Sequence, residues 1–325
     1  MSELPYARLL PDVVLTALES VGIACTGTIL ALNSYENRVY QLGTEDGFVV
    51  AKFYRPARWS NAAILEEHEF SLELAAHEVP VVPPLRLKDR TLHEHEGYRF
   101  AVFARHGGRW PELATKDERA WMGRFLARIH ALGAMRRFAA RPTLSIEALG
   151  HRSVAEISAR GCVPAHLVQS YASIAADVLA AVERNFAEVG AYRVLRIHGD
   201  CHPGNVLWTD GGPHFVDLDD CMNGPAVQDL WLFLSGSREE MGAQLADILE
   251  GYEQFHEFDY RELKLIEALR TLRIVHYTAW IARRWEDPAF PRAFPWFTEN
   301  KYWEDHVLAL REQRAALDEP NLPLA

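Results

Sequence analysis

The sequence predicts an α+β protein of two lobes, a small lobe with an antiparallel sheet and one main helix followed by a larger, mostly helical lobe. Two observations lead to this prediction. The first hundred residues alternate short apolar runs with polar turns, as strands joined by hairpins do. From about residue 110, apolar residues recur at the three- and four-residue spacing of helices. We expect the small lobe to span residues 1–104, a hinge 105–109, and the large lobe 110–325.

The small lobe is expected to begin with a helix and an antiparallel meander. The helix is predicted over residues 9–21, and the strands over 29–32, 37–42 and 48–54. Next comes an extended strand over 79–85, with prolines at edge positions, and then a hairpin of 91–93 and 98–103. The third strand of the meander carries Lys52, which on a strand is most often a solvated edge residue.

A helix is predicted over residues 62–76, because Ser60 and Asn61 are good N-caps. Helical spacing places Glu67 on the apolar arc of this helix, where a carboxylate is costly unless it is paired. Lys52 is the cation best placed to pair with it, and we therefore predict a Lys52–Glu67 ion pair. The plainer alternative is that Glu67 lies at the edge of the arc and reaches water.

The most informative stretch runs from residue 198 to 220, where short apolar runs end in polar residues. Asp200 and Asn205 are five positions apart, the spacing of Asp and Asn in the catalytic loop of protein kinases. Asp217 follows the next predicted hairpin. An amide and a carboxylate, Asn205 and Asp217, suit magnesium, which prefers oxygen ligands and keeps some of its waters. Asp200 is then left to orient an attacking hydroxyl and accept its proton, so this stretch predicts phosphoryl transfer.

Other residues are expected to support this stretch. His198 is expected to brace the loop by hydrogen bonding. Asp229 lies in a predicted apolar helix over residues 226–234, and it is expected to bind backbone N–H groups of the loop. Asp219 is expected to assist a second cation, because it points the same way along a strand as Asp217. The tail after Glu319 is expected to be disordered.

The predicted phosphate loop has no GxGxxG pattern. The turn after the first long strand instead contains small and amide side chains, which still let backbone N–H groups approach a phosphate. We expect Ser34 to contact the nucleotide, with Asn33 and Asn37 as weaker candidates.

Composition excludes several classes of protein. The net charge of −11 disfavours a nucleic-acid partner. The four cysteines are far apart and form no CxxC pair, which favours reduced thiols in the cytoplasm over a disulfide scaffold or zinc site. The sequence has neither a signal-peptide pattern nor an apolar run long enough to cross a bilayer, so no membrane association is expected. We expect a monomer.

At the level of motifs, the chain resembles the aminoglycoside-phosphotransferase-like kinases, a branch of the protein-kinase-like fold. The residues that carry this resemblance are His198, Gly199, Asp200, Asn205 and Asp217. Longer runs extend it over nearly the whole chain to a bacterial family of stress-response kinases: 32–40, 52–56, 64–68, 215–220, 223–231 and 283–296.

This resemblance implies an ATP- and magnesium-dependent serine/threonine protein kinase of the cytoplasm, linked to envelope and oxidative stress. Asp200 would accept the proton, and Asp217 would act in catalysis and as a magnesium ligand beside Asn205. Ser34, Lys52 and Glu67 would serve the nucleotide site. ATP and a protein substrate are the implied partners.

Other functions remain open on the sequence alone. A small-molecule kinase could phosphorylate a hydroxyl of an amino sugar or amino alcohol, since an acidic cleft would suit a cationic substrate. His198, Asp200 and His202 could instead form a transition-metal site for hydrolysis, which would leave Asn205 and Lys52 without a role. A pseudokinase scaffold is a further alternative, although no expected catalytic position is missing. Cys201 and Cys221 raise the hypothesis of a redox switch, against the simpler expectation of buried, inert thiols.

Overall fold

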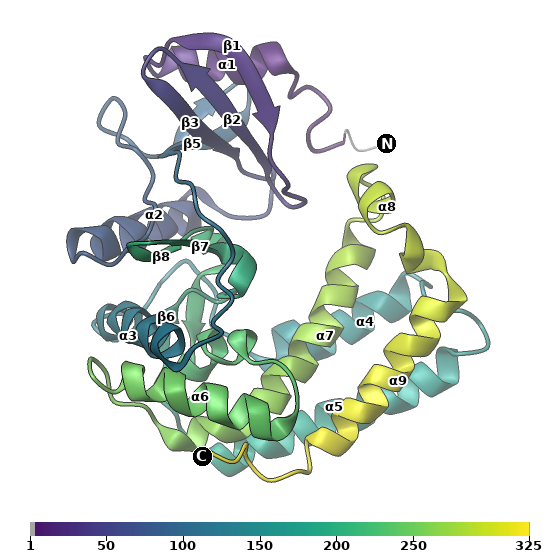
Figure 1. Ribbon diagram of the computed structural model, residues 1–325. Helices are drawn as coiled ribbons and strands as arrows, with labels where there is room; N and C mark the ends of the chain where they lie inside the picture. Colours follow the sequence, from purple (N-terminus) through teal and green to yellow (C-terminus); the bar gives the residue numbers. More distant parts are fainter. Residues whose placement is uncertain (1–3, 325) are drawn as a thin grey trace.

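The computed structural model describes residues 4–324 and shows two lobes (Figure 1). Within these residues the small lobe contains a five-stranded sheet of order β1-β2-β3-β5-β4, in which every neighbouring pair is antiparallel. The strands are β1 (Cys25–Ala31), β2 (Arg38–Thr44), β3 (Gly47–Phe53), β4 (His93–His95) and β5 (Tyr98–Ala104), and the helices are α1 (Pro11–Ser20) and α2 (Asn61–Ala76). The predicted meander, hairpin and main helix are confirmed.

Helix α2 joins the small lobe to the large one. The Ser60 hydroxyl caps it by accepting a hydrogen bond from Ala63 N at 3.1 Å. Phe70 and Leu74 on its buried face belong to the hydrophobic core of the large lobe. Glu67, on the same face, is therefore held between the two lobes.

The large lobe is mostly helical, as predicted, and α3 packs against α6, α4 against α7, and α5 against α9. Its helices are α3 (Lys116–Gly133), α4 (Arg152–Ala159), α5 (Val168–Val189), α6 (Arg238–Tyr252), α7 (Ile266–Arg283), α8 (Ala289–Ala293) and α9 (Asn300–Ala316), with a π-turn η1 (Glu147–His151) and 3₁₀ turns η6 (Tyr260–Leu265) and η7 (Pro295–Thr298). No helix within residues 4–324 combines the length and apolar character needed to cross a bilayer.

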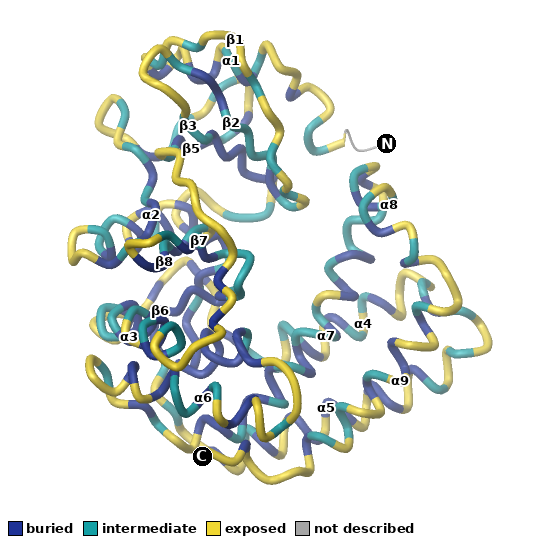
Figure 2. The backbone as a smooth tube through the Cα atoms, viewed as in Figure 1, coloured by how far each residue is buried: buried dark blue, intermediate teal, exposed yellow. Residues whose placement is uncertain are grey.

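Short strands and turns carry the polar stretch between the lobes. Strand β6 pairs with β9, and β7 with β8, both antiparallel. These elements are β6 (Leu195–Ile197), η2 (Pro203–Asn205), β7 (Val206–Thr209), β8 (Gly212–Phe215), η3 (Leu218–Asp220), β9 (Met222–Gly224), η4 (Ala226–Asp229) and η5 (Trp231–Phe233). Residues between Ala104 and Lys116 connect the sheet to α3 and are mostly exposed (Figure 2). The role of 105–109 as a hinge remains a prediction.

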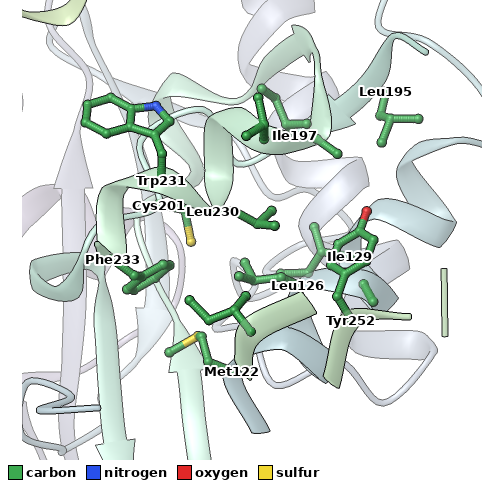
Figure 3. Close-up of a cluster of buried hydrophobic side chains, with 14 of the residues drawn as sticks. Met122, Leu126, Ile129, Leu195, Ile197, Cys201, Leu230, Trp231, Phe233 and Tyr252 are labelled. Carbon is green, nitrogen blue, oxygen red and sulfur yellow. The ribbon is translucent and has the colours of Figure 1, made fainter. Parts of the chain in front are cut away.

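Cys201 and Cys221 are fully buried. Figure 3 shows Cys201 among apolar side chains, including Leu230 and Phe233. Burial raises the pKa of both thiols above the ordinary value. Because the thiolate is the reactive form, these cysteines have the environment of inert core residues rather than of redox sensors.

Three expectations about local structure are wrong. Residues 79–85 make only isolated bridges within the described chain, because prolines lack the N–H group needed to continue a ladder. Residues 226–234 form the turns η4 and η5 instead of an α-helix, since the side chains of Gln228 and Asp229 bind the neighbouring loop. The tail is ordered beyond Glu319: Leu322 is buried in the core, and Arg238 donates to Pro320 O at 2.5 Å.

Candidate active site

The loop after β6 carries Asp200 and Asn205 on consecutive turns. The Asn205 side-chain nitrogen donates to Asp200 O at 3.0 Å, which leaves the amide oxygen as the atom able to bind a cation. Val216 N donates to Asn205 O at 3.0 Å. This bond ties the segment that precedes Asp217 to Asn205, and the structure therefore brings the three predicted residues together.

Asp217 has a left-handed backbone conformation, with φ 57° and ψ 60°. Such a conformation costs a non-glycine residue about 1–3 kcal/mol and is concentrated at functional sites. The side chain is 53% exposed, and its Oδ1 lies 3.0 Å from Lys52 Nζ. The strained backbone therefore presents a carboxylate to solvent beside a buried lysine.

Lys52 is surrounded by three carboxylates. Its Nζ lies 3.3 Å from Glu67 Oε1, 3.0 Å from Asp217 Oδ1 and 3.1 Å from Asp219 Oδ1. The predicted Lys52–Glu67 ion pair is thus confirmed. Burial alone would lower the pKa of Lys52, but Asp217, Asp219 and Glu67 together raise that pKa well above its ordinary value. Lys52 is therefore a permanent cation at the base of the site.

Asp219 does not have the environment expected of a second cation ligand. It lies in the 3₁₀ turn η3 and not on a strand, so strand alternation does not place it beside Asp217, although both carboxylates contact Lys52 Nζ. It is buried and forms ion pairs with Lys52 and Arg58, and it also accepts from the Asn37 side-chain nitrogen at 3.1 Å. Burial would raise the pKa of Asp219, but Arg58 and Lys52 hold it below its ordinary range.

Two arginines that the sequence did not single out complete this network. Arg141 is buried and donates to Glu67 Oε2 at 2.7 Å and to Asp219 O at 2.6 Å. Arg58, in the segment between β3 and α2, pairs with both Asp219 and Asp220 of the large lobe. Glu67 and Asp219, which both contact Lys52, are therefore also neutralised by cations from elsewhere in the chain.

Asp200 is held between two basic groups. Arg273 on α7 donates to its Oδ1 at 2.5 Å, and His202 Nε2 lies 3.6 Å from its Oδ2. Burial would raise the pKa of Asp200, but the hydrogen bond from His202 and the charge of Arg273 hold it well below its ordinary range. The Asp200 side chain is 26% exposed, so it is an ionised carboxylate within reach of solvent.

His198 and Asp229 hold the loop that carries Asp200 by hydrogen bonds, as predicted. His198 Nε2 donates to Val216 O at 3.0 Å. Asp229 accepts from His198 N at 2.7 Å and from Gly199 N at 2.8 Å, and it lies 3.1 Å from His130 Nε2. His130 is fully buried, and its ring is part of this polar network.

The turn over residues 33–37 is stabilised internally. Ser34 Oγ donates to Asn37 O at 3.2 Å, and the half-buried Ser34 stays a candidate for the nucleotide. The Asn37 side chain is already occupied, because it binds Asp219 and also accepts from Arg55 N at 3.1 Å. Asn37 is thus a structural residue of the turn in this structure.

The same turn contacts the large lobe across the site. Glu36 accepts from Trp280 Nε1 at 2.6 Å and from Arg284 Nη2 at 2.8 Å. Tyr35 packs on Phe294 with ring centroids 5.1 Å apart. Figure 1 shows α7 rising towards the small lobe and ending near α8. We call the contact of residues 35–36 with 280–294 the interlobe clamp.

The geometry does not support the hydrolytic alternative. His198 uses Nε2 on a backbone carbonyl, and no group of three or more His, Cys, Asp or Glu side chains in residues 4–324 is arranged to hold a metal ion. An amide and one carboxylate would instead leave most positions of a hard cation to phosphate oxygens and water.

Comparisons with known proteins agree with this geometry. The model of the phosphotransferase enzyme family matches residues 28–266. Stress response kinase A of Escherichia coli K12 is 46% identical over 99% of this chain and 98% of its own, and the serine/threonine protein kinase RdoA of Salmonella typhimurium LT2 is 45% identical over 98% and 97%.

Solved structures share the fold at low sequence identity. An amicoumacin kinase in complex with AMP-PNP, Ca²⁺ and its ligand matches with TM-score 0.73 and 17% identity over 96% of this chain and 95% of its own. A microcompartment-associated aminopropanol kinase matches with TM-score 0.72 and 19% identity over 97% and 100%. The two-lobed kinase-like fold expected from the sequence is confirmed.

Proposed function

The chain belongs to the phosphotransferase enzyme family, among relatives named stress response kinase A, and we propose that it transfers the γ-phosphoryl group of ATP to serine or threonine hydroxyls of proteins. The observation that carries this proposal is an ionised, partly exposed Asp200 beside the metal-binding atoms offered by Asn205 and Asp217. We further propose that it acts in a bacterial stress response in the cytoplasm, as a monomer, since a single chain supplies every group.

The side chains fit a magnesium ion. Asn205 offers an amide oxygen, and Asp217 offers an exposed carboxylate whose backbone strain aims it away from the core. When bound there, magnesium would neutralise charge on the β- and γ-phosphates. Lys52 would supply a second positive charge for the phosphates, held in place by Glu67.

The proposed step is an in-line displacement. The acceptor oxygen forms a bond to the γ-phosphorus, and the bond from that phosphorus to the bridging oxygen breaks, so that ADP leaves with the electron pair. The acceptor proton passes to the Asp200 carboxylate. Catalysis would then be mainly electrostatic and positional, with Lys52 opposing the phosphate charge.

Replacing Asp217 by asparagine should weaken binding of ATP in the presence of magnesium by at least about a hundredfold. Losing a residue that only hydrogen-bonds to a metal ligand already costs about 10–100-fold in metal affinity, and Asp217 is proposed to bind the metal itself. Titration calorimetry with MgATP and with metal-free ATP measures this directly. The Asp217→Asn variant should bind MgATP and metal-free ATP with nearly equal affinity.

The matched control is Asp210→Asn, a change of the same charge at the exposed turn between β7 and β8. It should bind MgATP like the unaltered protein. If the ATP affinity of Asp217→Asn depended on magnesium as strongly as that of the unaltered protein, Asp217 would not be a magnesium ligand.

A small-molecule acceptor is the second candidate, and one observation favours it. The interlobe clamp joins the two lobes through Glu36–Arg284 and Tyr35–Phe294, on the other side of the molecule from the connection between β5 and α3 (Figure 1). A protein segment would need this contact to open, whereas a small alcohol would not.

The two acceptor classes can be separated by one screen with γ-labelled ATP. We expect label on serine and threonine of bacterial proteins and of peptides, and none above the Asp200→Asn background on amino sugars or amino alcohols. If label appeared on a purified metabolite and on no protein or peptide, the acceptor would be a small molecule and the protein-kinase proposal would be wrong.

A further inference from the structure

Arg273 stands out among the arginines at the site. Arg58 and Arg284 are paired with carboxylates that have no proposed role in proton transfer, whereas Arg273 is paired with Asp200 itself. Its side chain is 40% exposed, and within residues 4–324 Asp200 is its only hydrogen-bonding or ion-pair partner. A guanidinium has five N–H donors, so most of its binding capacity faces solvent beside the proposed proton acceptor.

Arginines gather around this part of α7, and each of them is paired with a carboxylate. His276, one turn away, has its pKa lowered to about 4 by burial and by the charges of Arg283, Arg284, Arg273 and Arg58. At the exposed side of the Arg273 guanidinium, a positive charge on an incoming acceptor would be opposed and a negative charge would be attracted.

Tyr277 continues the same face of the helix. It is exposed, lies one turn beyond Arg273, and stacks on Trp280 with ring centroids 5.7 Å apart. The accessible part of α7 next to Asp200 thus offers the unused N–H donors of Arg273, one turn from the exposed ring of Tyr277, and the planar fork of guanidinium donors suits a carboxylate or a phosphate.

We infer that Arg273 binds the acceptor, and that the acceptor hydroxyl lies in a peptide close to an anionic group, either a carboxylate or a phosphate. This inference rests on the protein-kinase function proposed above and adds the substrate class to it. When the hydroxyl reaches Asp200, the Arg273 guanidinium turns its remaining donors to that anionic group. A lysine or other amine at the same place meets the like charge of the guanidinium.

The test compares four serine peptides that differ only beside the acceptor: flanked by glutamate, by phosphoserine, by alanine or by lysine. We expect the unaltered protein to prefer the anionic peptides over the lysine peptide by about tenfold in kcat/KM, as a partly exposed charged hydrogen bond allows. Arg273→Ala should bring the ratio close to one, and Arg273→Lys should restore part of it. The ratio within one variant cancels any general effect on Asp200, and glutamate against phosphoserine identifies the anion.

Arg270→Ala is the control, because Arg270 lies one turn earlier on α7 and pairs with Glu267 at 3.2 Å, away from Asp200. It should keep the full preference. An unchanged preference in Arg273→Ala, or equal use of all four peptides by the unaltered protein, overturns the inference alone. Absence of transfer to any peptide, with MgATP binding intact, overturns the protein-acceptor function and this inference with it.

Discussion

Replacing Asp200 by asparagine is expected to lower kcat for phosphoryl transfer by about 10²–10⁴-fold, the contribution of a positioned general base. Asparagine keeps the size of the side chain but cannot take the acceptor proton. Binding of MgATP should remain within about threefold, because the phosphates are assigned to Lys52, Asn205 and Asp217. Steady-state kinetics and calorimetry on the same preparation separate the two effects.

The fold should not be affected by this change. Asp200 loses its ion pair with Arg273, but both side chains are partly exposed, and such pairs contribute at most about 1 kcal/mol. An unaltered melting temperature would exclude unfolding as the cause. If Asp200→Asn kept most of its kcat, Asp200 would not be the proton acceptor and the assignment of the loop would fail.

The sequence correctly predicts the placement of residues that are close in the chain, while their catalytic roles stay predictions. Asp200, Asn205 and Asp217 lie within one segment of short strands, so their spacing already places them on neighbouring turns. Glu67 was identified because helical periodicity places its carboxylate on the apolar side of the helix, where it needs a cation. Lys52, on the adjoining sheet, is that cation.

The missed residues are those whose partners are distant in sequence. Arg58 meets Asp219 across 161 positions, Arg141 meets Glu67 across 74, and Arg273 meets Asp200 across 73. No local period or spacing encodes such pairs, because they depend on how the lobes pack. A single arginine on a helix or in a loop looks the same whether it is solvated or buried against a carboxylate.

The same reason explains the wrong helix over residues 226–234. The apolar content of this segment favours a helix, but Gln228 and Asp229 must both bind the loop above them. The Gln228 side-chain nitrogen donates to Gly199 O at 3.0 Å, so two consecutive side chains serve one loop. These tertiary hydrogen bonds override the helical propensity of the segment, and Asp229 accepts two of them.

Asp229→Ala is therefore expected to lower the free energy of unfolding by about 3–5 kcal/mol, the loss seen when one partner of a buried polar group is removed. The N–H groups of His198 and Gly199 would be left buried without an acceptor, and His130 would lose its partner. Urea denaturation measures the change, and kcat should fall as well, because Asp200 directly follows these two residues. The control is Asp247→Asn on α6, which removes the charge of a partly exposed carboxylate that pairs with Arg119 of α3. It should lower the free energy of unfolding by less than about 1 kcal/mol. Similar losses in the two variants would mean that Asp229 is not the acceptor on which the loop depends.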